Sequence, residues 1–154
     1  MRSTTRWRFR RNRLPYSSRI RWTGSPRGAK GGKVPVSSEP KPETAAETFF
    51  ALDIRKGTVV RAEINEGAKK PAYRLWVDFG DPVGVRQSSA QLTRRYTPEA
   101  LVGTPVLGVL NFPPRRIAGF RSEVLVLGTF DPNDPGDVIL VRPDADCPDG
   151  HPLG

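Results

Sequence analysis

At residues 73–79 the sequence reads Tyr-Arg-Leu-Trp-Val-Asp-Phe. Apolar residues at positions 73, 75, 77 and 79 alternate with Arg74, Trp76 and Asp78, which is the period-two pattern of a strand with one buried face. Further segments of similar length are bounded by Gly, Pro or Asp, as strands joined by tight turns are. These segments are residues 58–64, 83–88, 106–111, 123–127 and 138–141. The pattern predicts an all-β barrel or sandwich.

One short helix is expected between the third and fourth of these strands. Thr97 can cap its first turn, Pro98 suits the first helical position, Glu99 complements the positive end of the helix dipole, and Gly103 ends the helix. Five strands with one helix in this place match the OB-fold, a partly open five-stranded Greek-key barrel that binds oligonucleotides across one face. The predicted fold is therefore an all-β OB-fold with terminal extensions.

The charge of the chain is distributed unevenly. The 154 residues carry a formal net charge of +9. Residues 1–48 hold 12 Lys and Arg against 3 acids, whereas residues 49–154 hold 13 of each. Because the first third also lacks apolar periodicity, it cannot build a core. We predict a basic, disordered extension over residues 1–48 and an OB-fold domain over residues 49–154.

Three interpretations of the basic extension stay open. It can be an arm that raises nucleic-acid affinity, with Trp7, Phe9 and Trp22 stacking on bases. Its Arg- and Ser-rich, acid-poor composition also resembles an organelle transit peptide. It can equally be a stretch attached by a misplaced start codon. The sequence contains neither a secretory apolar region nor a run of about 20 apolar residues, so no membrane insertion is expected.

A stiff turn is expected at residues 111–116, which read Asn-Phe-Pro-Pro-Arg-Arg. The two prolines fix φ, and the arginines donate paired hydrogen bonds that suit phosphate. Arg74 and Arg86, placed on the solvent sides of their strands, are expected to meet backbone phosphates. The sequence thus favours a nucleic acid as the partner.

Several motifs follow one another along residues 49–154. They are Asp53-Ile54-Arg55-Lys56-Gly57, Lys70-Pro71-Ala72-Tyr73-Arg74-Leu75, Asp78-Phe79-Gly80, Ser88-Ser89-Ala90-Gln91, Tyr96-Thr97-Pro98-Glu99, Asn111-Phe112-Pro113-Pro114 and Ser122-Glu123-Val124-Leu125-Val126-Leu127-Gly128. Together they closely resemble the CsaA-type proteins, which are stand-alone bacterial members of the tRNA-binding domain family. The resemblance implies an OB-fold, a homodimer built partly from the terminal extensions, binding of tRNA or similar structured RNA, and a chaperone role on unfolded export substrates. The carboxyl-terminal end of the domain is accordingly expected to be a dimerisation extension.

The chain departs from this family at two motif positions. Lys56 stands where the family usually has valine, and it is expected to extend the basic face. Arg74 stands where a lysine is usual, so the charge is kept. The resemblance to the modules fused to methionyl- and phenylalanyl-tRNA synthetases is looser.

The candidate RNA-binding residues combine these motifs with the exposed cations and hydroxyls. They are Arg55, Lys70, Arg74, Arg86, Ser88, Ser89, Asn111, Arg115, Arg116, Arg121 and Ser122. Ordinary explanations stay open, because exposed arginines often form a plain solvated face, and Ser and Asn often satisfy backbone groups at turns. The alternative function is a chaperone that holds unfolded, export-bound polypeptides in an apolar groove formed by Phe112 and Phe120. An aromatic beside a barrel can equally be simple packing.

Enzymatic and metal chemistry are not expected. The single histidine, His151, lies in a Pro- and Gly-rich tail, so a Ser-His or Cys-His pair has no credible base. Cys147 and His151 leave a zinc site two ligands short. A single cysteine forms no internal disulfide and suits a reducing compartment. We therefore expect a cytoplasmic, non-enzymatic protein without metal or cofactor.

Overall fold

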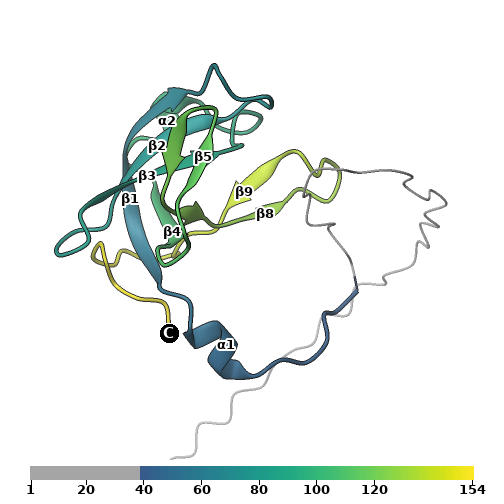
Figure 1. The fold of residues 1–154 in the computed structure, drawn as a ribbon, viewed down its shortest axis with the longest axis vertical. Helices are drawn as coiled ribbons and strands as arrows, with labels where there is room; N and C mark the ends of the chain where they lie inside the picture. Colours follow the sequence, from purple (N-terminus) through teal and green to yellow (C-terminus); the bar gives the residue numbers. More distant parts are fainter. Residues whose placement is uncertain (1–38) are drawn as a thin grey trace, which may run out of the picture. The chain divides into compact units, whose positions relative to one another are not determined.

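The computed structural model describes residues 39–154, and the expectations for residues 1–38 lie outside this part (Figure 1). The barrel strands are β1 (Ile54–Ile64), β2 (Tyr73–Asp78), β3 (Val85–Ala90), β4 (Pro105–Val109) and β7 (Leu125–Val126). The remaining elements are α1 (Ala46–Phe50), α2 (Pro98–Leu101), β5 (Arg115–Ile117), β6 (Phe120–Ser122), β8 (Gly128–Phe130) and β9 (Val138–Leu140). Neither helix of the described residues is long and apolar enough to cross a membrane.

The five barrel strands form one antiparallel sheet in the order β3-β2-β1-β4-β7. The sheet curls until its two edges nearly meet. The backbone amides of Glu123 and Val124, just before β7, donate to the carbonyl of Gln87 in β3 at 2.8 and 3.2 Å. Two smaller hairpins, β5–β6 and β8–β9, are appended to this barrel. The prediction of an all-β, OB-fold-like barrel is confirmed.

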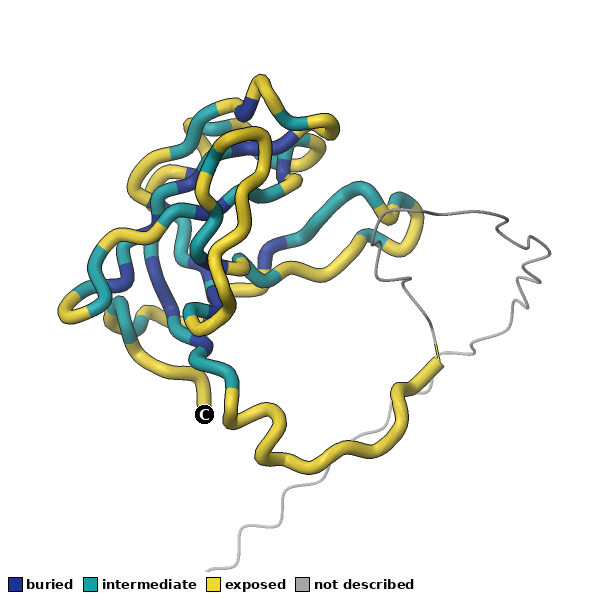
Figure 2. The backbone as a smooth tube through the Cα atoms, in the orientation of Figure 1, coloured by how far each residue is buried: buried dark blue, intermediate teal, exposed yellow. Residues whose placement is uncertain are grey.

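The residues of β2 alternate between the buried core and the outer face of the sheet. Tyr73, Leu75 and Val77 are buried, and Phe79 lies just beyond the strand with none of its surface exposed. The Phe79 ring fills the space above two glycines of neighbouring strands, because a Cβ at Gly57 would lie 2.7 Å from the ring and one at Gly108 would lie 3.0 Å from it. Figure 2 shows the buried residues concentrated on the barrel strands.

A β-bulge at Val60 changes which residues of β1 point into the barrel, so that inward-pointing positions are odd-numbered before it and even-numbered after it. The register shifts between Val59, which lies opposite Val77, and Arg61, which lies opposite Trp76. Val59 is buried, whereas Val60 and Arg61 are exposed. Because a bulge places an extra residue in one strand, Arg61 comes to the outer face of the sheet.

The helix predicted from Thr97 is confirmed. The Thr97 hydroxyl accepts a hydrogen bond from the amide of Ala100 at 3.3 Å, and Pro98 occupies the first turn. The predicted strands are present, although β1 begins earlier than expected, β3 is shifted by two residues to Val85–Ala90, and β7 is only two residues long.

The turn expected at residues 111–116 is only partly right, because Arg115 and Arg116 lie in a strand. They belong to β5, which pairs with β6 through a tight turn at Ala118 and Gly119. Both turn residues have positive φ, 50° and 76°. A two-residue turn with positive φ at both positions matches the twist of the two strands. Asn-Gly is the usual sequence of such a turn, and Ala-Gly is a weaker signal for it.

Candidate nucleic-acid interface

The β5–β6 hairpin is fixed against the outer face of β2 and β3. The Ser122 hydroxyl accepts a hydrogen bond from the backbone amide of Ser89 at 3.1 Å. The Phe120 ring packs edge-on against Trp76, with 5.6 Å between ring centroids. One face of the hairpin is therefore attached to the sheet, and its other face is left to solvent.

The solvent face of the hairpin carries two arginines side by side. Arg116 and Arg121 are direct partners in the β5–β6 ladder, and both are exposed. Like charges directly opposite one another in a sheet repel, and an anion between them removes that repulsion. The Nε of Arg121 lies 3.4 Å from the Glu123 carboxylate, whereas Arg116 forms no ion pair with another described residue. Two guanidinium groups thus lie side by side on the solvent face of the hairpin.

Arg74 adds a third guanidinium next to the hairpin. It lies on the outer face of β2, with its guanidinium carbon 5.4 Å from the centroid of the Phe120 ring. Glu63 is its ladder partner in β1, but the Glu63 carboxylate accepts a hydrogen bond from Arg61 Nε at 2.8 Å. Arg61 also lies over the Trp76 ring, 4.4 Å from its centroid. Arg74 therefore forms no ion pair with a carboxylate of the described residues.

The loop at residues 65–72 borders the tip of the hairpin. A Cβ at Gly67 would lie 3.2 Å from the Cβ of Ala118, so the two loops are in contact. The loop also carries Lys70, which is exposed. We call the surface formed by these elements the hairpin patch. The patch includes both faces of the hairpin, because Arg116 and Arg121 lie on its solvent face, whereas Arg115 and Ser122 share the face of Phe120. Its members are Lys70, Arg74, Ser89, Arg115, Arg116, Arg121 and Ser122.

Two candidate residues lie outside the hairpin patch because their side chains support the fold. Ser88 lies within β3 rather than at its end, is 1% exposed, and donates to the carbonyl of Val124 at 2.8 Å. Asn111 accepts from the amide of Asp53 at 2.9 Å and donates to the carbonyl of Ala51 at 2.8 Å. Ser88 thus helps to close the barrel, and Asn111 holds the segment that leads into β1.

Two candidate arginines also lie elsewhere. Arg55 Nε is 2.7 Å from the Asp53 carboxylate, and one of its terminal nitrogens donates to the carbonyl of Gly150 at 3.2 Å. Arg86 is exposed as expected, but it lies opposite Val77, which points into the core. Arg86 is therefore on the inner side of the sheet, the side opposite to Arg74.

The expectation that Lys56 extends the basic face is wrong. Lys56 is 8% exposed. Its Nζ lies 2.8 Å from the Asp149 carboxylate and donates to the Thr58 hydroxyl at 3.2 Å. The carboxyl-terminal segment therefore covers and neutralises this cation.

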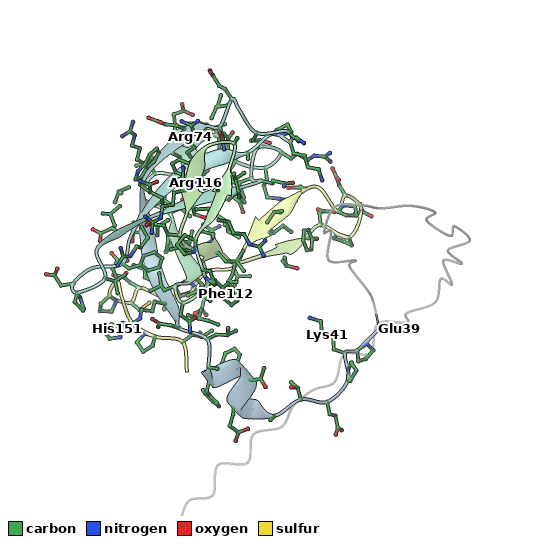
Figure 3. The ribbon with its side chains drawn as sticks, viewed as in Figure 1. Glu39, Lys41, Arg74, Phe112, Arg116 and His151 are labelled. Atoms are coloured by element: carbon green, nitrogen blue, oxygen red, sulfur yellow. The ribbon has the colours of Figure 1, made fainter. Side chains whose placement is uncertain are left out.

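The two aromatics expected to form a peptide groove lie at different ends of the β5–β6 hairpin. Phe120 pairs with Ile117 beside the hairpin tip and packs on Trp76. Phe112 is 43% exposed and precedes β5 by three residues, beyond the open end of the hairpin. Figure 3 shows Phe112 well separated from Arg116 and Arg74.

Two further arginines form ion pairs with aspartates of the β8–β9 loop. Arg94 forms an ion pair with Asp134. Arg95 bonds Asp137, and this hydrogen bond raises the pKa of its guanidinium above the ordinary value. The pKa of Asp134 is lowered, first by the amide of Gly136 and then by Arg94. These guanidinium groups are already paired with carboxylates and are poorly placed to bind an added anion.

Comparisons with known proteins identify the family of the chain. The family model described as "Putative tRNA binding domain" matches residues 54–152. The chain is 49% identical to the chaperone CsaA of Bacillus anthracis, and the match covers 73% of this chain and 100% of that one with a TM-score of 0.69. The CsaA chaperone of Picrophilus torridus is 38% identical over 73% of this chain and 100% of its own, with a TM-score of 0.66. The resemblance to CsaA-type proteins is thereby confirmed.

The chain also resembles one segment of a much larger enzyme. It is 41% identical over 110 residues to the methionine–tRNA ligase of Methanothrix thermoacetophila, a match that covers 71% of this chain. The chain spans about 15% of the length of that ligase. The similarity thus concerns one module of the ligase.

Proposed function

The chain belongs to the tRNA-binding domain family, and from this premise we propose that it binds tRNA or a similarly structured RNA through the hairpin patch. The observation that carries the proposal is the exposed cross-strand pair of Arg116 and Arg121, held in place by a hairpin that is itself fixed to the barrel. A rigid support reduces the entropy lost when a side chain is ordered on binding.

The chemistry of the hairpin patch suits a phosphodiester backbone. Guanidinium groups donate two parallel hydrogen bonds to phosphate oxygens, and Lys70 adds a point charge. Contacts to phosphates position a protein on RNA without reading its sequence, so recognition by this surface depends on RNA shape. Residues 49–154 hold equal numbers of acids and bases, and Arg94 and Arg95 are paired with acids, whereas Arg74 and Arg116 form no ion pair with another described residue.

The proposal predicts that tRNA affinity falls steeply with salt. The five cations of the hairpin patch would give a slope of log K against log salt of about −4, which is roughly a 200-fold loss between about 50 and about 200 mM. Gel-shift titrations with tRNA measure this slope. Affinity that does not change with salt would contradict the proposal.

The same titration on a chain lacking residues 1–45 separates the domain from the basic extension. We propose that residues 49–154 form the RNA-binding domain, so binding should persist after the deletion with a somewhat lower salt slope. Complete loss of binding would assign the site to the extension instead.

The chaperone alternative is not favoured. Two related structures are those of proteins described as chaperones. In the present chain, however, Phe120 packs against Trp76. Phe112 precedes β5, whereas Phe120 begins β6 beside the hairpin tip, so the two rings lie at different ends of the hairpin. The family match is to a nucleic-acid-binding domain rather than to a catalytic one, which agrees with the expected absence of enzymatic chemistry.

We also propose that the protein is a homodimer that uses its terminal segments. None of the residues of α1 is buried, and Phe49 and Phe50 are 44% and 68% exposed (Figure 2). Leu153 near the other terminus is 43% exposed. Apolar side chains gathered at chain ends favour burial against a second copy. Light scattering at several concentrations should give twice the 17.0 kDa chain mass; a single-chain mass throughout would refute this assembly.

A further inference from the structure

Within the described part of the chain, Asn65 has a buried side-chain amide with one hydrogen-bonding group unsatisfied. It directly follows β1 and is 3% exposed. Its Oδ1 accepts a hydrogen bond from Arg74 Nε at 3.2 Å. Its Nδ2 is buried and has no hydrogen-bond partner among the described residues. A buried donor without an acceptor is unfavourable and rare in folded proteins, so it calls for an explanation.

The orientation of this amide follows from its partner. Arg74 Nε can only donate, so the oxygen of Asn65 must face it. Turning the amide over would set two donors against each other. The unpartnered group is therefore the nitrogen.

The backbone around Asn65 holds the amide in place. Its backbone nitrogen donates to the carbonyl of Ala72 at 2.9 Å, and its carbonyl accepts from the amide of Ala68 at 3.1 Å. These bonds close the loop at residues 65–72 at its base. Asn65 is thus a fixed support, and its hydrogen bond fixes the direction in which the guanidinium of Arg74 points.

The bond to Asn65 uses only the Nε of Arg74. Its two terminal nitrogens donate no hydrogen bond to another described residue, and the guanidinium lies near the Phe120 ring on one side. These free terminal nitrogens are all donors. A site composed only of donors suits an oxyanion, whereas a base edge offers a mixture of donors and acceptors.

We propose that Asn65 is a positioning residue for Arg74, which it holds with the terminal nitrogens ready to bind one phosphate of the bound RNA. This inference rests on the proposed function, because it takes the RNA backbone as the ligand. It assigns Asn65 a role that no motif of the sequence indicates.

The test measures tRNA affinity and its salt slope for Asn65→Ala, Asn65→Asp, Arg74→Ala and the double variant Asn65→Ala/Arg74→Ala. Asn65→Ala should weaken binding about tenfold and reduce the salt slope by about 1, as Arg74→Ala does. Adding Asn65→Ala to Arg74→Ala should change affinity less than about twofold, because Asn65 acts through Arg74. Full additivity would overturn the positioning role.

Asn65→Asp tests the free charge of Arg74 separately from its position. The aspartate retains the acceptor for Arg74 Nε but pairs its own negative charge with the guanidinium, so affinity should fall at least as far as in Asn65→Ala. Asn133→Asp, on the exposed β8–β9 loop, makes the same charge change away from the patch and should leave tRNA affinity nearly unchanged. Asn65 variants that bind like the unaltered chain overturn this inference alone, whereas an unaltered chain without salt-dependent binding overturns the proposed function.

Discussion

Replacing Arg116 and Arg121 together by alanine is expected to weaken tRNA binding by about 100-fold. Hydrogen bonds to charged groups contribute about 1.5 kcal/mol each after desolvation, and two of them amount to about 3 kcal/mol. The two side chains face solvent from paired positions, so their removal leaves the barrel intact. The slope of log K against log salt should also decrease by about 2. Fluorescence anisotropy at several salt concentrations measures both quantities.

The matched control removes two arginines from other surfaces, Arg86 and Arg142. Arg86 lies on the inner side of the sheet, and Arg142 is exposed in the carboxyl-terminal segment. This control makes the same change in net charge, and we expect it to reduce affinity less than about fivefold by general electrostatics. Equal losses in the two double variants would mean that overall charge, rather than the hairpin patch, determines binding.

Replacing Phe79 by alanine is expected to lower the free energy of unfolding by about 3–5 kcal/mol, the usual range for a buried phenylalanine. The ring has no exposed surface and occupies the space left by Gly57 and Gly108. A cavity there cannot be filled by its neighbours, since neither glycine has a side chain. Urea unfolding followed by tryptophan fluorescence gives the difference.

Phe112→Ala is the same substitution at a position that is 43% exposed, and it should change the free energy of unfolding by less than about 1 kcal/mol. If Phe79→Ala were as mild as Phe112→Ala, Phe79 would not be the centre of the core described above.

The barrel could be predicted because its signals are local. The alternation of β2 determines which residues are buried, and Thr97 marks the start of α2 through its own hydroxyl. The β5–β6 hairpin was missed because Ala118 adopts a positive φ that its residue type rarely shows. The sequence therefore indicates Arg115 and Arg116 as exposed cations but does not predict the strand β5 in which they lie.

The candidate site could be predicted only in part, since it depends on contacts between distant segments. Arg86 lies on the same side of β3 as the buried Ser88, whereas the apolar Val85 beside it is 49% exposed, so the residue types of β3 indicate the wrong side of the sheet. Lys56 appeared to be a free cation because Asp149, its partner, is 93 residues away. Asn65 carries no sequence signal, since its role comes from Arg74 on the next strand.

The central claim is that RNA lies on the hairpin patch. Its most direct test is the mapping of backbone amide chemical shifts of the full chain during titration with a transcribed tRNA. The account predicts the largest changes at residues 65–74 and 115–122, together with Ser89. Changes confined to the carboxyl-terminal segment, or to the strand end around Arg86, would contradict it.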